Sequence, residues 1–318
     1  MTASAGSIQP IRYKGFLAYS LESEAIKLIV VPELGAKIVT MLDKRSGKEW
    51  LAGAGGRKLR KVAYASDFAQ ADVSGWDECF PTVLACSYPG KGQFEGRFMP
   101  DHGELWSIPW EARVGPTGIV CSVQGRALPY RFQREMSLAD ERTFRFAYRV
   151  ANEGEETWSA LWCAHPLFLA TEHTEIFLPG EVTEVLCVDG GRKLQSGAIY
   201  SWPEGDDSLP YPIHRIGPSS SRDSRKFYVS GTVKEGRAGL IEKHTGASIE
   251  LLWSPEQLPY LGVWVNEGGY LETPVCAIEP CNGFYDDLAA ADANDRRLRL
   301  EPGQACEWEL YVRLNDLI

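Results

Sequence analysis

The sequence predicts an all-β protein, a large antiparallel β-sandwich with few short helices. Three observations favour this class: apolar and polar residues alternate with period two, turn-forming Gly, Pro, Asp or Asn residues separate the alternating runs, and no window sustains a 3.6-residue period. Strand follows strand without the helical crossovers that a parallel sheet requires. No segment resembles a flexible linker, so we expect one domain over residues 1–318.

The clearest strand signal is TFRFAYRV at 143–150, where four large apolar side chains share one face. The segment 306–314 repeats this pattern near the end of the sequence. In chain order, the other expected strands lie at 14–20, 26–31, 36–42, 107–113, 117–124, 130–137, 157–163, 225–231, 237–243, 247–253, 260–266 and 296–300. Long loops are expected at 51–61, 89–103 and 203–224.

The composition is that of a globular protein with enough aromatic residues for both a core and a binding site. Hydrophobic residues make up 44%, and 10 Trp, 13 Tyr and 12 Phe suffice for a core and a ligand cleft. The 33 Lys and Arg residues are scattered among 43 Asp and Glu residues, and the formal charge of −10 argues against nucleic acid as a partner.

The sequence shows neither a targeting segment nor a membrane span. The N-terminal residues lack the apolar core of a signal peptide, and no 18-residue apolar run occurs, so we expect a cytoplasmic protein without a membrane partner. The eight cysteines are widely spread and form no CxxC pair, so we expect them to be reduced core residues.

Common cofactor and nucleophile motifs are absent. The sequence has no GxSxG elbow, no GxxxxGK phosphate loop and no HExxH zinc helix. The segment PGKGQFEG at 89–96 has glycines but no preceding strand and following helix, so we interpret it as a surface loop that could cover a cleft. We therefore expect no cofactor.

The most informative residue is Glu279, which lies between Ile278 and Pro280 at the end of an apolar stretch. Burial would raise its pKa and make it a proton acceptor near neutral pH. Two histidines could complete a site, His102 in DHGELW and His165 in AHPLF. Taken singly, each has an ordinary alternative, because an acid at a strand end often binds loop backbone and most histidines are structural.

Aromatic residues beside carboxylates indicate a carbohydrate site. Trp76 and Asp77 in SGWDECFPTV would let the apolar face of a sugar stack on a ring while its hydroxyls reach an acid. Trp264 in LGVWVNEGG could stack in the same way. The alternatives are a buried turn for the first segment and a core tryptophan for the second.

Taken in order, these motifs resemble the aldose 1-epimerases, or galactose mutarotases. The resemblance spans roughly residues 14–314 and follows LIVVPELGAKIVTMLDKRSGKEWL, an FP segment, DHGELW, a strand ending in Asn (FAYRVANEGEETWSALW), HPLF, and the Glu of IEPCNGFYDD. It implies a galactose mutarotase-like supersandwich and an isomerase that interconverts the α and β anomers of an aldose. It further implies that His165 is the general acid, Glu279 the general base, and His102 a residue that binds or polarises the sugar.

Anomer exchange needs one proton accepted at the C1 hydroxyl and another donated to the ring oxygen. We expect a carboxylate and an imidazolium to suit this task because each favours the other's charged form. No metal is expected: two histidines and a carboxylate could form a facial metal site, but these residues lie on separate elements without a short His spacing.

Two departures from the family pattern leave the substrate open. No arginine follows the FP segment in the usual GR or NR motif, and Arg97 in EGR is the candidate replacement. No aspartate in 180–210 matches the usual substrate-binding one, so Asp77 is the candidate to hold a hydroxyl. A phosphorylated or acidic sugar is an alternative substrate, with the basic segment 55–61 and Arg97 as its partners. A non-catalytic carbohydrate-binding or sensor protein is the alternative from another class.

Overall fold

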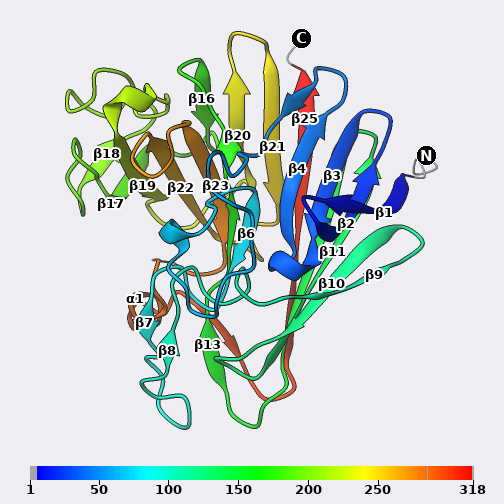
Figure 1. Ribbon diagram of the computed structural model, residues 1–318. Helices are drawn as coiled ribbons and strands as arrows, with labels where there is room; N and C mark the ends of the chain where they lie inside the picture. The colour runs from blue at the N-terminus through cyan, green and yellow to red at the C-terminus, as the bar shows by residue number, and fades with distance from the viewer. Residues whose placement is uncertain (1–5, 285, 317–318) are drawn as a thin grey trace.

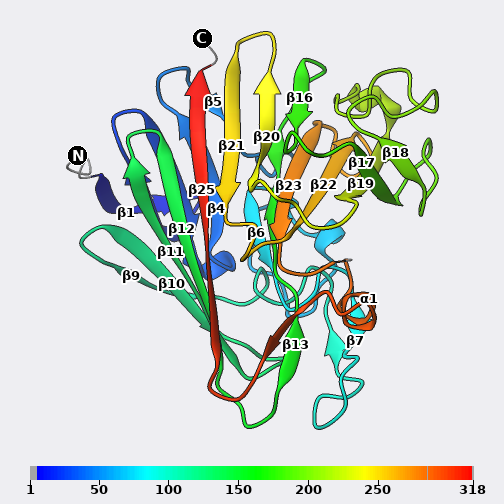
Figure 2. The same ribbon diagram turned by 180° about the vertical axis from the view of Figure 1, so that it is seen from behind.

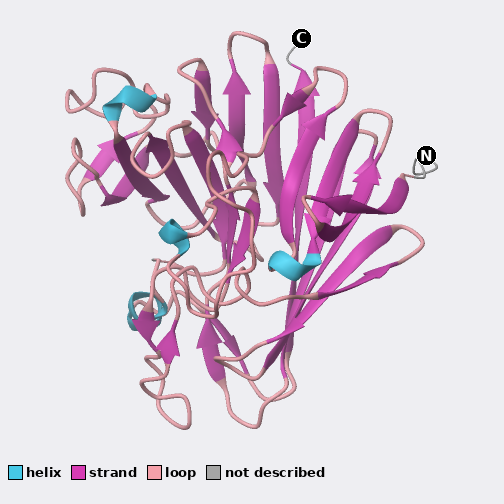
Figure 3. Ribbon diagram, viewed as in Figure 1, coloured by secondary structure: helices cyan, strands magenta, loops and turns pink. Residues whose placement is uncertain are grey.

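The computed structural model describes residues 6–284 and 286–316, and strands dominate it (Figure 3). The described residues contain one α-helix, α1 (Leu288–Ala293), and three single-turn 3₁₀ helices, η1 (Pro32–Leu34), η2 (Phe68–Gln70) and η3 (Ser219–Ser221). The predicted all-β class is therefore confirmed. None of these helices is long and apolar enough to cross a membrane.

The first of two large sheets carries 13 strands (Figure 1). Its order is β1 (Ser7–Tyr13), β2 (Phe16–Glu22), β3 (Ile26–Val31), β4 (Lys37–Asp43), β6 (Trp76–Cys79), β14 (Cys163–Pro166), β23 (Val275–Cys281), β22 (Tyr260–Glu267), β19 (Asp223–Val229), β17 (Glu184–Asp189) and β18 (Ile199–Ser201). In addition, β5 (Lys48–Glu49) pairs with β4, and β15 (Phe168–Leu169) pairs with β23.

The second sheet carries eight strands and lies nearer the viewer in Figure 2. Its order is β16 (Thr174–Phe177), β20 (Arg237–Glu242), β21 (Ala247–Trp253), β25 (Ala305–Asp316), β12 (Thr143–Asn152), β11 (Tyr130–Asp140), β10 (Gly118–Gln124) and β9 (Glu111–Val114). Two small sheets pair β13 (Trp158–Ala160) with β24 (Leu298–Leu300) and β7 (Cys86–Ser87) with β8 (Phe98–Met99). The two large sheets pack face to face, which makes the molecule an antiparallel sandwich.

The alternating strands form the core between these sheets. Phe146 on β12 pairs with Leu310 on β25, and both side chains are fully buried. Trp76 on β6 of the first sheet meets Phe146 edge-on, with ring centroids 5.3 Å apart. Large apolar residues from both sheets therefore interlock in one core.

A buried ion pair also lies in this core. Arg134 donates to Glu78 with Nη1 2.6 Å from Oε1, and neither side chain is exposed. Tyr148 donates to the same oxygen at 3.0 Å, and the Trp162 indole donates to Oε2 at 2.8 Å. Three hydrogen-bond donors, one of them the Arg134 guanidinium, thus meet the Glu78 carboxylate and compensate the burial of the two charges.

Several strand boundaries differ from those expected, and two of the differences have a clear physical cause. The strand expected at 107–113 begins only at Glu111, because Pro109 has no backbone N–H to give to a ladder. The strand expected at 157–163 divides into β13 and β14, because the backbone N–H of Leu161 donates instead to the carbonyl of Pro81. All eight cysteines are free; six are buried, as expected of core residues, whereas Cys86 and Cys306 are only half-buried.

Candidate active site

Five neighbouring strands of the first sheet bring polar side chains together on the face that is turned away from the second sheet. Successive residues of a strand point to opposite faces, so each core residue on these strands is followed or preceded by one that faces outward. The outward residues come in sheet order from β6, β14, β23, β22 and β19, and they are Asp77, His165, Glu279, Trp264 and Lys226. Their neighbours Trp76, Ala164, Ile278, Val263 and Phe227 lie in the core.

Loops cover this face and leave a cleft of about 640 Å³, within the size range of small-molecule sites. Loop residues 67–73, 83–85 and 101–102 form one side, and strand residues form the floor. The lining residues are Asp67, Phe68, Ala69, Val73, Val83, Leu84, Ala85, Asp101, His102, His165, Val188, Asp189, Lys226, Trp264, Tyr270 and Asp286.

His165 lines the floor of the cleft, and Glu279 lies beside it, buried beneath that floor and not among the lining residues. Nε2 of His165 lies 3.9 Å from Oε1 of Glu279, and the two side chains are 6% and 0% exposed. Neither Oε1 of Glu279 nor Nδ1 of His165 has a hydrogen-bond partner among the described residues. The fold thus brings an acceptor oxygen of Glu279 and the imidazole of His165 close together.

The other oxygen of Glu279 is held by the protein. Lys226 Nζ lies 2.8 Å from Oε2, and the Cys163 thiol lies 3.7 Å from it. Gly262, opposite Glu279 in the β22–β23 ladder, makes room for this carboxylate, because a Cβ there would lie 2.9 Å from Oε2. Burial raises the pKa of Glu279; Lys226 opposes this shift and Asp286 adds to it.

Lys226 bridges two carboxylates. Its Nζ lies 2.8 Å from Glu279 Oε2 and 2.8 Å from Asp286 Oδ1, and the Tyr228 hydroxyl donates to that Asp286 oxygen at 2.6 Å. Burial alone would lower the pKa of Lys226, but Asp286 and Glu279 outweigh it and raise the pKa well above the usual value. The ammonium is therefore a permanent charge of the site.

The electrostatics of His165 differ from the expectation. Burial lowers its pKa well below the usual range, and the positive charges of His102, Lys226 and Lys37 add to this effect. The imidazole is thus neutral at neutral pH, whereas the sequence suggested an imidazolium stabilised by Glu279. The sequence could not show that Lys226 and Lys37 come close enough to His165 to lower its pKa.

His102 lies in the cleft wall, above the histidine on the floor. Its ring stacks on Phe68 at 4.0 Å and meets the ring of His165 at 4.9 Å, centroid to centroid. Asp101 holds this arrangement with both oxygens, since Oδ1 lies 3.0 Å from Nδ1 of His102 and Oδ2 accepts the backbone N–H of Phe68 at 3.0 Å. His102 has a φ of 55°, and the following Gly103 packs against the Phe80 backbone with no space for a side chain.

Trp264 and Tyr270 form an aromatic wall. The Trp264 ring lies 6.3 Å from the His165 ring and 5.8 Å from that of Tyr270. Tyr270 is 47% exposed and lines the mouth of the cleft. Trp264 thus lines the cleft, unlike the core tryptophan that was the alternative.

Three other residues expected to contact a substrate do not line the cleft. Trp76 is buried in the core, because it occupies an inward position of β6. Arg97 donates to the carbonyl of Ala127 at 2.8 Å and lies over the Phe94 ring. Asp77 lies beneath the cleft, opposite His165 in the β6–β14 ladder.

Asp77 instead belongs to a buried ion network. Lys37 Nζ lies 2.5 Å from Asp77 Oδ2 and 3.0 Å from Asp72 Oδ2. Burial raises the pKa of Asp77 to about 6, although Lys37 opposes the shift. Asp77 therefore supports the floor of the site from below.

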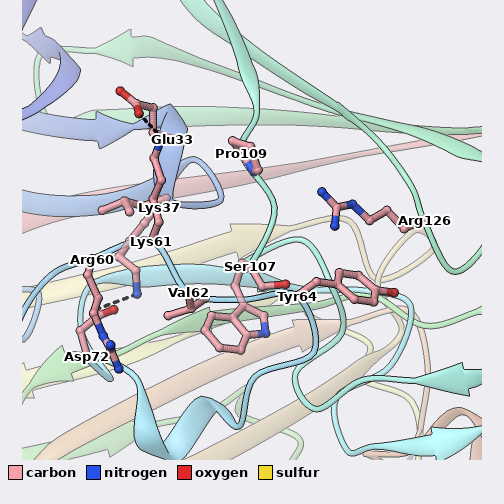
Figure 4. Close-up of a pocket in the computed structure, with 12 residues that line it drawn as sticks. Glu33, Lys37, Arg60, Lys61, Val62, Tyr64, Asp72, Ser107, Pro109 and Arg126 are labelled. Atoms are coloured by element: carbon pink, nitrogen blue, oxygen red, sulfur yellow. Dashed lines mark ion pairs between the residues drawn. The ribbon is translucent and has the colours of Figure 1, made fainter.

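The basic segment 55–61 lies outside the cleft. Arg60 and Lys61 line a separate hollow of about 150 Å³, shown in Figure 4, which shares no lining residue with the cleft. Lys61 pairs there with Glu33 at 2.5 Å. Arg57 donates to the carbonyls of Ala69, Ala71 and Tyr270, and so ties the cleft wall together rather than facing a ligand.

Sequence reasoning named none of the five charged residues that line the cleft besides its histidines, which are Asp67, Asp101, Asp189, Lys226 and Asp286. Lys226 could have been found from the sequence, because a lysine between Arg225 and Phe227 in a buried strand must pair with a carboxylate to be stable there. Asp189 lies in the 180–210 interval where no matching aspartate was recognised, and its Oδ1 accepts the Gly191 N–H at 3.0 Å. Asp286 follows β23 and had no signal of its own. Across the described ranges, no group of three or more His, Cys, Asp or Glu side chains is arranged to hold a metal ion.

Comparisons with known proteins bear on the fold. No protein-family model matches the sequence, and no curated protein matches it either. Solved structures do match over nearly the whole chain. The Slr1438 protein of Synechocystis sp. PCC 6803 is 17% identical, with 98% of each chain covered and a TM-score of 0.71.

Two further structures carry descriptive names. A galactose mutarotase-like protein from Lactobacillus casei ATCC 334 is 16% identical, with 94% of this chain and 100% of that chain covered and a TM-score of 0.69. A candidate aldose 1-epimerase from Escherichia coli K12 is 20% identical, with 94% and 99% covered and a TM-score of 0.67. The chain therefore has the galactose mutarotase-like β-sandwich fold, as its sequence motifs indicated.

Proposed function

We propose that this protein is an aldose 1-epimerase-like isomerase that interconverts the anomers of a sugar in the cleft described above. One observation carries the proposal: Oε1 of Glu279 has no partner within the described chain, and it lies 3.9 Å from Nε2 of His165, which lines the floor of a cleft of about 640 Å³. Sugar binding alone needs no proton acceptor and donor arranged at one point, whereas anomer exchange does.

The reaction moves two protons. Glu279 Oε1 accepts the proton of the C1 hydroxyl while Nε2 of a protonated His165 gives its proton to the ring oxygen. The bond between C1 and the ring oxygen breaks, which leaves an open-chain aldehyde and a free hydroxyl. Rotation about C1–C2 presents the other face of the carbonyl, and the reverse transfers close the ring and restore both residues. This is general acid–base catalysis without a covalent intermediate.

The two groups share a single proton in the competent state. Burial raises the pKa of Glu279 and lowers that of His165, and these shifts favour the single proton on Glu279. The reactive arrangement, with the proton on His165, is the other tautomer of the same one-proton state. Activity requires this one-proton state. It is lost at high pH, where the pair has no proton, and at low pH, where the pair has two, and the dependence of kcat/KM on pH is bell-shaped.

The remaining cleft residues would bind the sugar. Trp264 and Tyr270 offer apolar ring faces, and the His102 ring, fixed by Asp101, reaches the space above His165. Asp189 and Asp286 offer carboxylate oxygens to hydroxyl groups.

The charge of the cleft favours a neutral aldose over a phosphorylated or acidic one. Among the described residues of the lining, Lys226 is the one lysine or arginine, and its charge is already met by two carboxylates. Four lining aspartates would repel an anionic substrate; they are Asp67, Asp101, Asp189 and Asp286.

The test is anomer equilibration of freshly dissolved α-glucose, α-galactose and other aldoses, followed by polarimetry or NMR, with the matching 6-phosphates and uronic acids. We expect acceleration for at least one neutral aldose and lower kcat/KM for its 6-phosphate. His165→Asn and Glu279→Gln should each lose about 10²- to 10⁴-fold in kcat. If no sugar in the panel equilibrates faster, although titration shows that sugars bind, the protein is a carbohydrate-binding protein and the enzymatic proposal is wrong.

A further inference from the structure

Lys226 is an unusual residue for the floor of a sugar site. It lies in the middle of β19, where its neighbours Arg225 and Phe227 are buried, and its own side chain is 8% exposed. Burying an ammonium is costly unless it is paired, and here two carboxylates at 2.8 Å meet it. A neutral polar side chain could bind a hydroxyl without this cost, so the charge itself calls for an explanation.

The two oxygens of Glu279 have different surroundings because of this lysine. Oε2 contacts the Lys226 ammonium at 2.8 Å and the Cys163 thiol at 3.7 Å, whereas Oε1 has no hydrogen-bond partner in the part of the chain that is described. A carboxylate held at one oxygen by a charge-assisted hydrogen bond keeps its orientation. Oε1 is then the oxygen that faces His165.

We propose that Lys226 is a positioning residue for the proton exchange at Glu279: its ammonium holds Oε2, directs Oε1 toward His165 and the sugar, and adjusts the pH range in which the pair holds one proton. This inference rests on the proposed function. Asp286 opposes the effect of Lys226 on the Glu279 pKa, because it shares the ammonium with Glu279 and adds a negative charge nearby.

The direction of the charge effect follows from the contacts. A positive charge favours an ionised carboxyl and disfavours an imidazolium, so Lys226 lowers the pKa of both Glu279 and His165. Asp286 acts in the opposite sense on Glu279. Several other titratable groups face Lys226 from the surrounding elements. They are Tyr228 on the same strand, Cys163 and His165 on β14, Asp189 on β17, Glu279 on β23, Asp286 in the loop after β23 and, across the cleft, His102.

The experiment compares the pH profile of kcat/KM for Lys226→Met, Lys226→Arg and Asp286→Asn with that of the wild type, on the best neutral aldose. Lys48→Met is the matched control, because Lys48 lies on β5 over the Trp50 ring and outside the cleft. For K226M we expect about 100-fold lower kcat, and both limbs of the bell at higher pH than in K48M. K226R keeps the charge and should return both limbs toward their wild-type positions, and D286N should move them to lower pH.

A purely structural lysine would lower the amount of folded enzyme without moving either limb. Unshifted limbs in K226M, or in D286N if K226M does not fold, would therefore overturn the inference and leave the isomerase function standing. An NMR titration of the His165 ring, assigned with His165→Asn, separates the two proposals further. If no sugar is turned over, a higher His165 pKa in K226M than in K48M still supports the charge effect of Lys226, and an unchanged pKa refutes it.

Discussion

Replacing Gly262 by alanine tests whether the missing side chain on β22 positions the carboxylate of Glu279. An alanine Cβ would lie 2.9 Å from Oε2 of Glu279 and 3.3 Å from Cε1 of Tyr228. Carbon–oxygen contacts of this kind settle at about 3.3–3.6 Å, so Oε2 must move by roughly half an ångström. The backbone of Gly262 needs no left-handed conformation, and the whole effect comes from this crowding.

The displacement has two measurable consequences. Overpacking a closed site costs about 1–3 kcal/mol of unfolding free energy, which denaturant titration would report. Moving Oε2 also lengthens its 2.8 Å contact with Lys226 and turns Oε1 away from its place 3.9 Å from His165 Nε2. Because a misplacement of 1 Å can cost about 100-fold, we expect about 10-fold lower kcat for anomer equilibration of the preferred aldose.

A matched control and a double variant make this test specific. Gly180→Ala is the control, since a Cβ there would meet no atom within 4 Å, and we expect stability within about 0.5 kcal/mol of the wild type. In the background of Glu279→Gln, the alanine at 262 should lower the residual rate far less, because the two sites are in contact and their effects do not add. Wild-type kcat in G262A, with the protein folded, would refute the idea that this glycine positions the base.

Three further outcomes are expected. Trp264→Ala should raise KM about 10-fold with a smaller effect on kcat, because the ring offers a stacking face rather than a proton. Steady-state kinetics measures both constants, and an unchanged KM would mean that the sugar binds elsewhere. Arg134→Met should lower the unfolding free energy by about 3–5 kcal/mol, since it leaves Glu78 buried without its cation; thermal and urea denaturation measure this, and a neutral result would contradict the ion pair. In the native protein, a thiol reagent should modify the half-buried Cys86 and Cys306 first, and mass spectrometry would identify the labelled residues. Burial raises the thiol pKa of Cys163 well above the usual value, so early labelling of Cys163 would contradict the closed floor of the site.

The alternation of strands explains which site residues could be inferred from the sequence and which could not. The motifs around His102, His165 and Glu279 located three side chains that the fold brings together in one cleft or beneath it. The segment WDEC showed aromatic and acidic residues but not their direction. Only the register of β6 against β14 reveals that Asp77 faces His165 while Trp76 and Glu78 point into the core.

The charges around the pair could not be foreseen for a similar reason. Lys226 and Asp286 are distant from His165 in sequence, and their meeting depends on the order of strands in the sheet. The basic segment 55–61 looked suited to an anionic substrate because composition carries no information on direction. Its Arg60 and Lys61 line another hollow.

The strand order also bears on how the molecule is assembled. His165 on β14 and Glu279 on β23 lie on strands that pair directly, yet more than a hundred residues separate them along the chain. Until β23 is synthesised and inserted, β14 is left with an unpaired edge beside β6, and such edges invite pairing with other chains. Contacts this distant in sequence form slowly. The site is therefore expected to form late in folding, and a chain that ends before residue 275 would lack both the base and the strand that seals the sheet.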